Sequence, residues 1–292
     1  MDTLSLSPDP TEKGAASGAQ SVERAMRLLG LVGREAERGI ALSQIVAASG
    51  LNKPTARRLL VALMRARLVE QDEASRRYFL SDEVYVLGLL ASRRHSFLDL
   101  AMENVRALAA VSGDTGFISM RRDAYAVCLH REEGSHPVRT HALQAGDQHP
   151  LGVGAGSLAI LAALPDAEIE DILARNADIL AARYPNYGHD VVCAAVAETR
   201  ADGIAFNPGL VVQNSWGIGR AVRFPDGRVA GALSLAAVDG RLQPSRRAEM
   251  AALLTRECTK VEEKLARLFQ GDRREHRSAP PFTKFNKEKS HA

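Results

Sequence analysis

Cysteine is scarce in this chain, with only Cys128, Cys193 and Cys258 among its 292 residues. The three lie far apart and form no CxxC pair, so the sequence predicts neither a disulfide framework nor a structural zinc site. We expect all three to be buried thiols, and we predict no metal and no cofactor.

Long apolar runs are also missing. No stretch of about eighteen uninterrupted apolar residues occurs, which argues against a membrane-spanning helix. The first twenty residues lack the basic start and apolar core of a secretory signal. We therefore expect a cytoplasmic protein that has no membrane partner.

Catalytic patterns are absent as well. The chain contains no GxSxG, HExxH or Walker pattern. The glycine-rich GVGAGS at residues 152–157 lacks the GxGxxG spacing of a dinucleotide site, and the AGDQHP before it does not look like a buried strand. Cys128 and His130 merely share one face of a strand. We predict no catalytic residues and no enzyme, with a nucleotide-cofactor enzyme as the weaker alternative.

What is present is the composition of a folded protein, with 46% hydrophobic and 25% charged residues. The chain is too long for one compact core. Residues 1–20 are rich in Ser, Pro, Gly and Ala, and residues 271–292 are polar and interrupted by proline, so we expect a disordered leader and a disordered tail. Between them we expect three folded parts, at residues 21–81, 82–95 and 96–270.

Charge is unevenly distributed. Residues 21–80 contain 11 Lys and Arg against 6 Asp and Glu, whereas the body that follows is net acidic. A basic unit attached to an acidic body suggests a polyanionic partner for the first unit alone.

The pattern of this basic unit is that of a winged helix-turn-helix. Ser21 is a candidate cap for a first helix over residues 21–36, Gly50 follows a short helix over residues 42–49, and Asn52 precedes a third helix. Two short strands, LVEQD and RRYFLS, then form a hairpin. The third helix has its apolar stripe at Ala56, Leu59, Leu60, Leu63 and Met64.

The polar side of the third helix carries the DNA prediction. Lys53, Thr55, Arg57 and Arg58 lie off its apolar stripe, near the end at which a recognition helix contacts bases and phosphates. The alternative is a solvated cationic face, but the preceding helix, the glycine turn and the basic hairpin favour binding to double-stranded DNA. The candidate DNA-binding residues are Ser43, Gln44, Lys53, Thr55, Arg57, Arg58, Arg76 and Arg77.

The segment DEVYVLGLLASRRH at residues 82–95 predicts a helix that is apolar around most of its circumference. Such a helix needs more than one packing partner, so we expect self-association into a dimer. Beyond it we expect hairpin strands around Asp123, a third strand over 136–146 and helices near 155, 166–176 and 190–202. Two strands around Pro225–Gly227 and a long helix over 244–269 complete the domain. Helices and strands mix without strict alternation, which indicates an α+β fold.

Several of these segments together resemble the IclR family of transcriptional regulators. The resemblance rests on SVERAMRLLGLV, on LSQIVAASGLNKPTARRLLVALMRARLVEQD, on RRYFLSDEVYVLG and, more loosely, on PLGVGAGSLAILAAL, GIAFNPG and DGRVAGALSLAAV. It implies an N-terminal winged helix-turn-helix, a linker helix and a C-terminal GAF-like effector-binding domain. It also implies a homodimer or a tetramer.

GVGAGS before a helix offers free amides and the positive end of a helix dipole, which together suit an anion, although a tight structural turn is the alternative. The resemblance favours the site, because in the family this segment contacts a carboxylate-bearing small-molecule effector. Where the family often has an acid, a cysteine and a second polar residue, this chain has Asn207, Gly217 and Ala236. The effector residues implied are Gly154, Ala155, Asn207, Gly217, Ser234 and Ala236.

Two neighbouring residues remain open as pocket residues. Trp216 fits the pocket or the core, and a lone tryptophan near a strand favours the core. Arg220, where the family often has an Ala-Pro pair with Ala221, groups by strand alternation with Ile218 and Val222 rather than with Gly217. The sequence and the resemblance thus predict a transcriptional regulator whose operator binding responds to a small organic acid, and they leave open whether it is a repressor or an activator. The alternative is an architectural DNA-binding protein whose second domain only dimerises.

Overall fold

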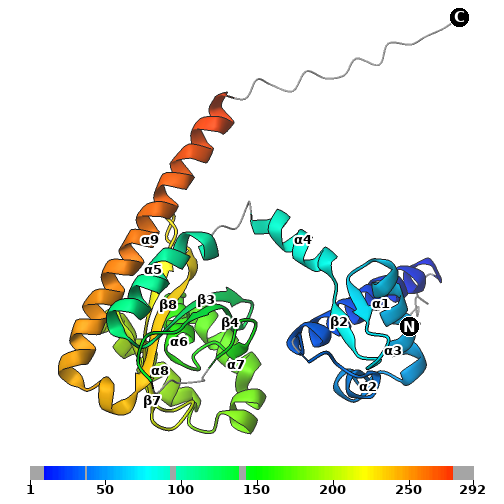
Figure 1. The fold of residues 1–292 in the computed structure, drawn as a ribbon, viewed down its shortest axis with the longest axis horizontal. Helices are drawn as coiled ribbons and strands as arrows, with labels where there is room; N and C mark the ends of the chain where they lie inside the picture. The colour runs from blue at the N-terminus through cyan, green and yellow to red at the C-terminus, as the bar shows by residue number, and fades with distance from the viewer. Residues whose placement is uncertain (1–9, 37, 93–96, 138–142, 279–292) are drawn as a thin grey trace, which may run out of the picture. The chain divides into compact units, whose positions relative to one another are not determined.

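The computed structural model describes residues 10–36, 38–92, 97–137 and 143–278 (Figure 1). The chain divides into two compact units, residues 1–96 and residues 97–292. No helix of the described residues is long and apolar enough to cross a membrane.

The first unit contains α1 (Pro10–Arg34), α2 (Leu42–Ser49), α3 (Lys53–Arg65), β1 (Val69–Gln71), β2 (Tyr78–Leu80) and α4 (Asp82–Ser92). The predicted roles of Gly50 and Asn52 at the helix ends are both confirmed. Gly50 ends α2 with a φ of 69°, and the Asn52 side chain accepts a hydrogen bond from the Thr55 amide at the start of α3. The core of this unit includes Leu28, Val32, Ile45, Ala56, Leu60 and Leu63.

The start of α1 differs from the prediction. The helix begins at Pro10, so Ser21 lies inside it rather than at its cap, and residues 10–20 are helical rather than disordered. Proline is tolerated in a first helical turn, and the alanines that follow favour helix. Val22 and Met26 in this helix are 63% and 52% exposed, although their spacing in the sequence predicts an apolar stripe.

The second unit opens with α5 (Phe97–Ser112) and contains one six-stranded sheet in the order β5-β4-β3-β8-β7-β6, with every neighbouring pair antiparallel. Mixed helices and one antiparallel sheet confirm the α+β class. The strands are β3 (Thr115–Arg122), β4 (Tyr125–Glu132), β5 (Gln148–Pro150), β6 (Ala205–Pro208), β7 (Ser215–Arg223) and β8 (Val229–Val238). The other helices are α6 (Ala155–Ala162), α7 (Asp166–Arg183), α8 (His189–Asp202) and α9 (Pro244–Ser278).

Two helical layers cover this sheet. α5 and α9 lie side by side on one face (Figure 1), and their apolar residues form one core with Ile118, Ile218 and Leu233. α6, α7 and α8 form a second core with Leu151 and Val153. The sheet therefore separates two cores. On the side of the second core, α6 is the helix that contacts the strands most extensively.

Three predictions for this unit need correction. The described residues of segment 136–146 form no strand, and its residues 138–142 lie outside the described structure. Gly146 takes a φ of 92° and Asp147 accepts a hydrogen bond from the Gln144 amide, so the chain turns here. Gly146 and Asp147 each make a backbone hydrogen bond with Cys128, and the regular pairing with β4 covers Gln148–Pro150. The short β6 was not predicted as a strand. The last helix continues to Ser278, because no proline interrupts it before Pro280, so residues 271–278 are not disordered.

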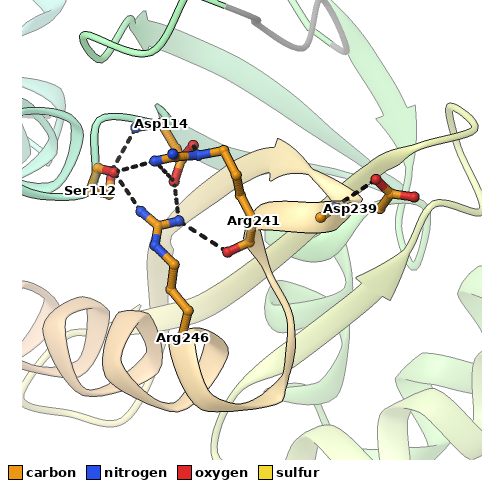
Figure 2. A network of polar contacts seen from close by, with 6 residues as sticks. Ser112, Asp114, Asp239, Arg241 and Arg246 are labelled. Carbon is orange, nitrogen blue, oxygen red and sulfur yellow. Dashed lines mark hydrogen bonds and ion pairs between the residues drawn. The ribbon is translucent and has the colours of Figure 1, made fainter.

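A buried carboxylate links the start of β3 to the residues that follow β8. Figure 2 shows Asp114, at the start of β3, between Arg241 and Arg246. Arg241 Nε lies 2.7 Å and Arg246 Nη1 lies 2.9 Å from the two carboxylate oxygens, and both guanidinium groups also donate to the Ser112 carbonyl. The network therefore fastens the α5–β3 junction to the β8–α9 junction.

We predict that Asp114→Asn lowers the free energy of unfolding of this unit by about 2 kcal/mol. The Asp114 side chain is only 4% exposed but both arginines are partly solvated, so the loss is smaller than for a fully buried pair. Urea unfolding followed by the fluorescence of Trp216, the one tryptophan of the chain, measures it. Asp239→Asn is the matched control, since among the described residues the Asp239 side chain accepts a hydrogen bond only from the neighbouring Gly240 amide. Equal stability of the two variants contradicts the account.

Candidate functional site

The outward side of α3 is a row of uncompensated cations. The helix contains Lys53, Arg57, Arg58 and Arg65 and no acidic residue, and the first three are exposed. Within the described part of the chain none of the four has an ion-pair partner. Charges that no carboxylate neutralises are available to phosphate groups.

The other helix residues predicted for DNA contact differ in how free they are. Ser43 is exposed on α2, whereas the Gln44 side chain accepts a hydrogen bond from the Ala41 amide at 3.0 Å and so helps to start that helix. Thr55 is half-buried, and its amide is the donor in the Asn52 cap. These three positions therefore combine surface and structural roles.

The two hairpin arginines also differ. Arg76 is exposed and has a φ of 57° in the turn. Arg77 Nη1 donates to the carbonyls of Gly39 at 2.8 Å and Arg38 at 3.3 Å, which holds the hairpin against the loop before α2. Contact with phosphate remains a prediction for both, but Arg77 already has a structural task.

In the second unit, strand register brings the predicted effector residues together. Asn207 on β6 pairs with Gly217 on β7, and Gly217 pairs with Ala236 on β8. Ser234 lies two residues along the same face, opposite Gly219. These four residues, together with Gly154 and Ala155, line a pocket that encloses about 580 Å³, part of it open to solvent.

Glycines allow α6 to approach this sheet at backbone contact. A Cβ atom on Gly219 would overlap the carbonyl oxygen of Ala155. A Cβ on Gly156 would lie 3.0 Å from Ser234 Oγ, and one on Gly217 would lie 3.3 Å from Ala155 Cβ. Larger residues would push the start of α6 away from the pocket floor.

The start of α6 presents unused hydrogen-bond donors. In the structure as described, the amides of Ala155, Gly156 and Ser157 have no acceptor, and Gly154 provides no side-chain cap. The Gly154 amide is different, because it donates to Tyr187 Oη at 3.2 Å. The free donors therefore begin at the Ala155 amide, one residue after Gly154.

Tyr187 lies behind the pocket lining, where it contacts Gly154 and Asn207, and the sequence did not reveal it. Its hydroxyl accepts from the Gly154 amide and donates to Asn207 Oδ1 at 3.1 Å, and Asn207 Oδ1 also accepts from the Leu210 amide. Burial raises the pKa of Tyr187 far above the neutral range, so this hydroxyl stays protonated and remains a donor. Asn207 is thus fixed by the structure, because its carbonyl oxygen is already used.

Ser119 lines the pocket from β3, a strand that carried no recognisable motif. Ser119 on β3 and Ser234 on β8 are buried, and their hydroxyls have no hydrogen-bond partner among the described residues. His149 also lines the pocket, and desolvation by burial lowers its pKa, which favours the neutral ring. Phe117, Ala126, Cys128 and Val153 supply apolar wall. The pocket thus offers neutral donors and an apolar wall.

Arg220 lies on the other side of β7, with Ile218 and Val222, as strand alternation predicts, and its Nη1 donates to the Gly203 carbonyl. Trp216 borders the pocket, but its ring packs edge-on against Phe206 at 5.5 Å and against the core below α9. Cys128 and Cys258 are buried thiols, whereas Cys193 is only partly buried, so the prediction for that residue was wrong.

Comparison with known families assigns both units. The model of the IclR helix-turn-helix domain matches residues 21–73, and that of the bacterial transcriptional regulator IclR C-terminal domain matches residues 91–262. The chain belongs to the IclR family of transcriptional regulators. In this IclR protein the first match contains α2 and α3, and the second contains the whole lining of the pocket.

Individual relatives agree with the assignment. The chain is 25% identical over 263 residues, 89% of its own length and 99% of the relative's, to the "Probable HTH-type transcriptional regulator ArcR" of Halobacterium salinarum. A solved IclR transcriptional regulator of Silicibacter sp. TM1040 superposes with a TM-score of 0.74 at 26% identity, covering 84% of this chain and 96% of that one. An IclR homologue of Microbacterium hydrocarbonoxydans solved with 4-hydroxybenzoate shares the fold, with a TM-score of 0.70 at 16% identity over 84% of this chain and 98% of that one.

Proposed function

We propose that this IclR regulator binds a specific operator through α3 and that a small carboxylate-bearing molecule in the pocket of the second unit changes its operator affinity. The observation that carries the proposal is the set of unused donors at the start of α6. They lie beside Ser119 and Ser234, two buried residues whose hydroxyls have no partner in the described part of the chain. We infer repression of transcription in the cytoplasm, with the acid as the signal.

The chemistry of the pocket suits a carboxylate attached to an apolar body. A carboxylate at the start of α6 would accept hydrogen bonds from the Ala155 and Gly156 amides and would meet the positive end of the helix dipole. Ser234 and Ser119 would supply further donors. The apolar wall formed by Phe117, Ala126 and Val153 suits the rest of such a molecule, and the related fold that holds 4-hydroxybenzoate supports this ligand class.

The apolar surface of α4 supports a dimer. Tyr85 is 70% exposed, Leu90 is 57% exposed, and Val86, Leu87 and Leu89 are each at least 44% exposed. A contiguous apolar helix of this kind costs solvation free energy unless another surface covers it. A second copy of the chain, packed through α4, would cover it and would place two copies of α3 on one operator.

We predict that Arg57→Ala and Arg58→Ala weaken binding to the operator by about 1 to 3 kcal/mol each, because a lost base-edge contact costs that much. The operator is first selected from a random duplex library with the wild-type protein. Fluorescence anisotropy then compares its affinity with that of a scrambled duplex, and the same titration gives the stoichiometry, expected to be two chains per operator.

Arg76→Ala is the comparison variant for this experiment. A residue that contacts only phosphate weakens both duplexes alike and reduces the slope of affinity against salt. Unchanged operator affinity of both α3 variants contradicts the assignment of α3, and one chain per operator contradicts the dimer.

We predict that Ser234→Ala weakens binding of the acid by about 0.5 to 1.5 kcal/mol, the contribution of one hydrogen bond, and that Gly154→Leu abolishes it by filling the pocket mouth. A thermal-shift screen of small organic acids that includes 4-hydroxybenzoate identifies the ligand, and calorimetry of that ligand compares the variants. DNA binding without the ligand should be unchanged in both.

Gly227→Leu is the matched control for Gly154→Leu. Gly227 has a φ of 86°, close to the 82° of Gly154, but lies in a turn with open surroundings. It therefore carries the same backbone strain without touching the pocket. Full ligand binding by Gly154→Leu contradicts the proposed site. If no acid binds the wild-type protein, the architectural role becomes the better account.

A further inference from the structure

α7 and α8 bring three different metal-ligating side chains together at a place unrelated to the pocket lining. Glu170 projects from the second turn of α7, and His189 and Cys193 come from the first turns of α8. His189 Nε2 lies 2.9 Å from Glu170 Oε2. Cys193 Sγ lies 3.8 Å from the His189 ring nitrogens and 3.9 Å from Glu170 Oε1.

The spacing in α8 produces this arrangement. His189 and Cys193 are four residues apart, so both side chains leave the same face of the helix one turn apart. Glu170 reaches that face from the neighbouring helix. A sulfur, an imidazole nitrogen and a carboxylate oxygen form a donor set that zinc-type ions take in proteins.

The distances also fit such an ion. With bonds of about 2.3 Å to sulfur and about 2.0 to 2.1 Å to nitrogen and oxygen, tetrahedral ligand atoms lie about 3.3 to 3.6 Å apart. The three ligand atoms here lie within 4.8 Å of one another, so small side-chain rotations bring them to these separations. Two of the three side chains are exposed and the third is only partly buried, which leaves the cluster open to an ion and to a fourth ligand.

We propose that Glu170, His189 and Cys193 form a binding site for a borderline transition-metal dication such as Zn²⁺ or Co²⁺. The ion binds through His189 Nε2, Cys193 Sγ and one Glu170 oxygen, with water as the fourth ligand. His189 Nδ1 lies 3.4 Å from Asp190 Oδ1, and this carboxylate orients the ring in the way that an outer-shell partner usually does. The prediction that the chain holds no metal came from counting cysteines, which does not detect a ligand set assembled from two helices.

Without an ion, His189 and Cys193 hold their protons more tightly than the free side chains do. Hydrogen bonds to Glu170 and Asp190 raise the pKa of His189, and desolvation raises the pKa of the Cys193 thiol. An ion must displace these protons, so its affinity falls as the pH falls.

The ion would join α7 to α8 at a point close to the pocket wall. Tyr187, whose hydroxyl links the Gly154 amide to Asn207, lies two residues before His189 in the segment between the two helices. A bound ion fixes the end of that segment. The site is nevertheless independent of the proposed effector, because none of its three ligands lines the pocket.

The test is a titration of the full-length protein with Co²⁺, followed by visible absorption and by the thiolate-to-cobalt charge-transfer band. The wild-type protein should show one site per chain with that band. C193S should lose the band, and H189A and E170Q should each bind at least about 10-fold more weakly, since even outer-shell changes cost that much. Far-UV circular dichroism checks that these surface variants remain folded.

His130→Ala is the matched control, because His130 Nε2 also lies 2.9 Å from a carboxylate oxygen, that of Glu132, without belonging to a metal-binding cluster among the described residues. It should bind Co²⁺ like the wild-type protein. The proposal is overturned if the wild-type protein shows no thiolate-to-cobalt band, if C193S retains it, or if His130→Ala weakens binding as much as H189A.

Discussion

The contact on which the second unit depends is the approach of α6 to β7, where the backbone of Ala155 rests against Gly219. Only a residue without a Cβ permits this approach, and it places the first amides of α6 over the floor formed by β7 and β8. The residue at the cap position, Gly154, has no side chain that could accept from these amides. A helix end with unused donors in a largely buried pocket is costly unless a ligand accepts from them. The close packing of α6 against β7 therefore also places the donors that a ligand would use.

The two units differ in the groups that they offer to an anion: α3 offers charged side chains, and the pocket offers neutral donors. α3 presents cations that no acidic side chain neutralises within the described part of the chain, which suits a partner with many phosphates and a strong dependence on salt. The pocket instead offers amides, hydroxyls and a histidine whose pKa is lowered by burial. Such a pocket suits the small anion that we propose as its ligand, held by directed hydrogen bonds. Arg220, the nearest candidate for a salt bridge, donates to a backbone carbonyl on the other side of its strand.

Local patterns in the sequence predicted most elements, because their causes are local. The Asn52 cap and the Gly50 turn follow from neighbouring residues, and the hairpin around Asp123 follows from alternation. Asn207, Gly217 and Ala236 were expected at the pocket from motif resemblance, and strand register places them in one row. Tyr187, Ser119 and the Glu170 cluster could not be predicted, since tertiary packing brings each of them next to segments that are distant in sequence. The strand predicted over residues 136–146 was wrong, because the chain turns at Gly146 and β5 begins only after this turn.

In the function that we propose, one free energy of coupling links occupancy of the pocket to occupancy of the operator. Thermodynamic linkage requires that the factor by which the acid changes operator affinity equals the factor by which the operator changes affinity for the acid. Calorimetric titration of the acid into the free protein, and into the protein saturated with operator duplex, measures this most directly. We expect the two dissociation constants for the acid to differ by roughly 5- to 150-fold, matching the shift in operator affinity. Identical constants in the two titrations would contradict the account, since the pocket would then have no influence on DNA binding.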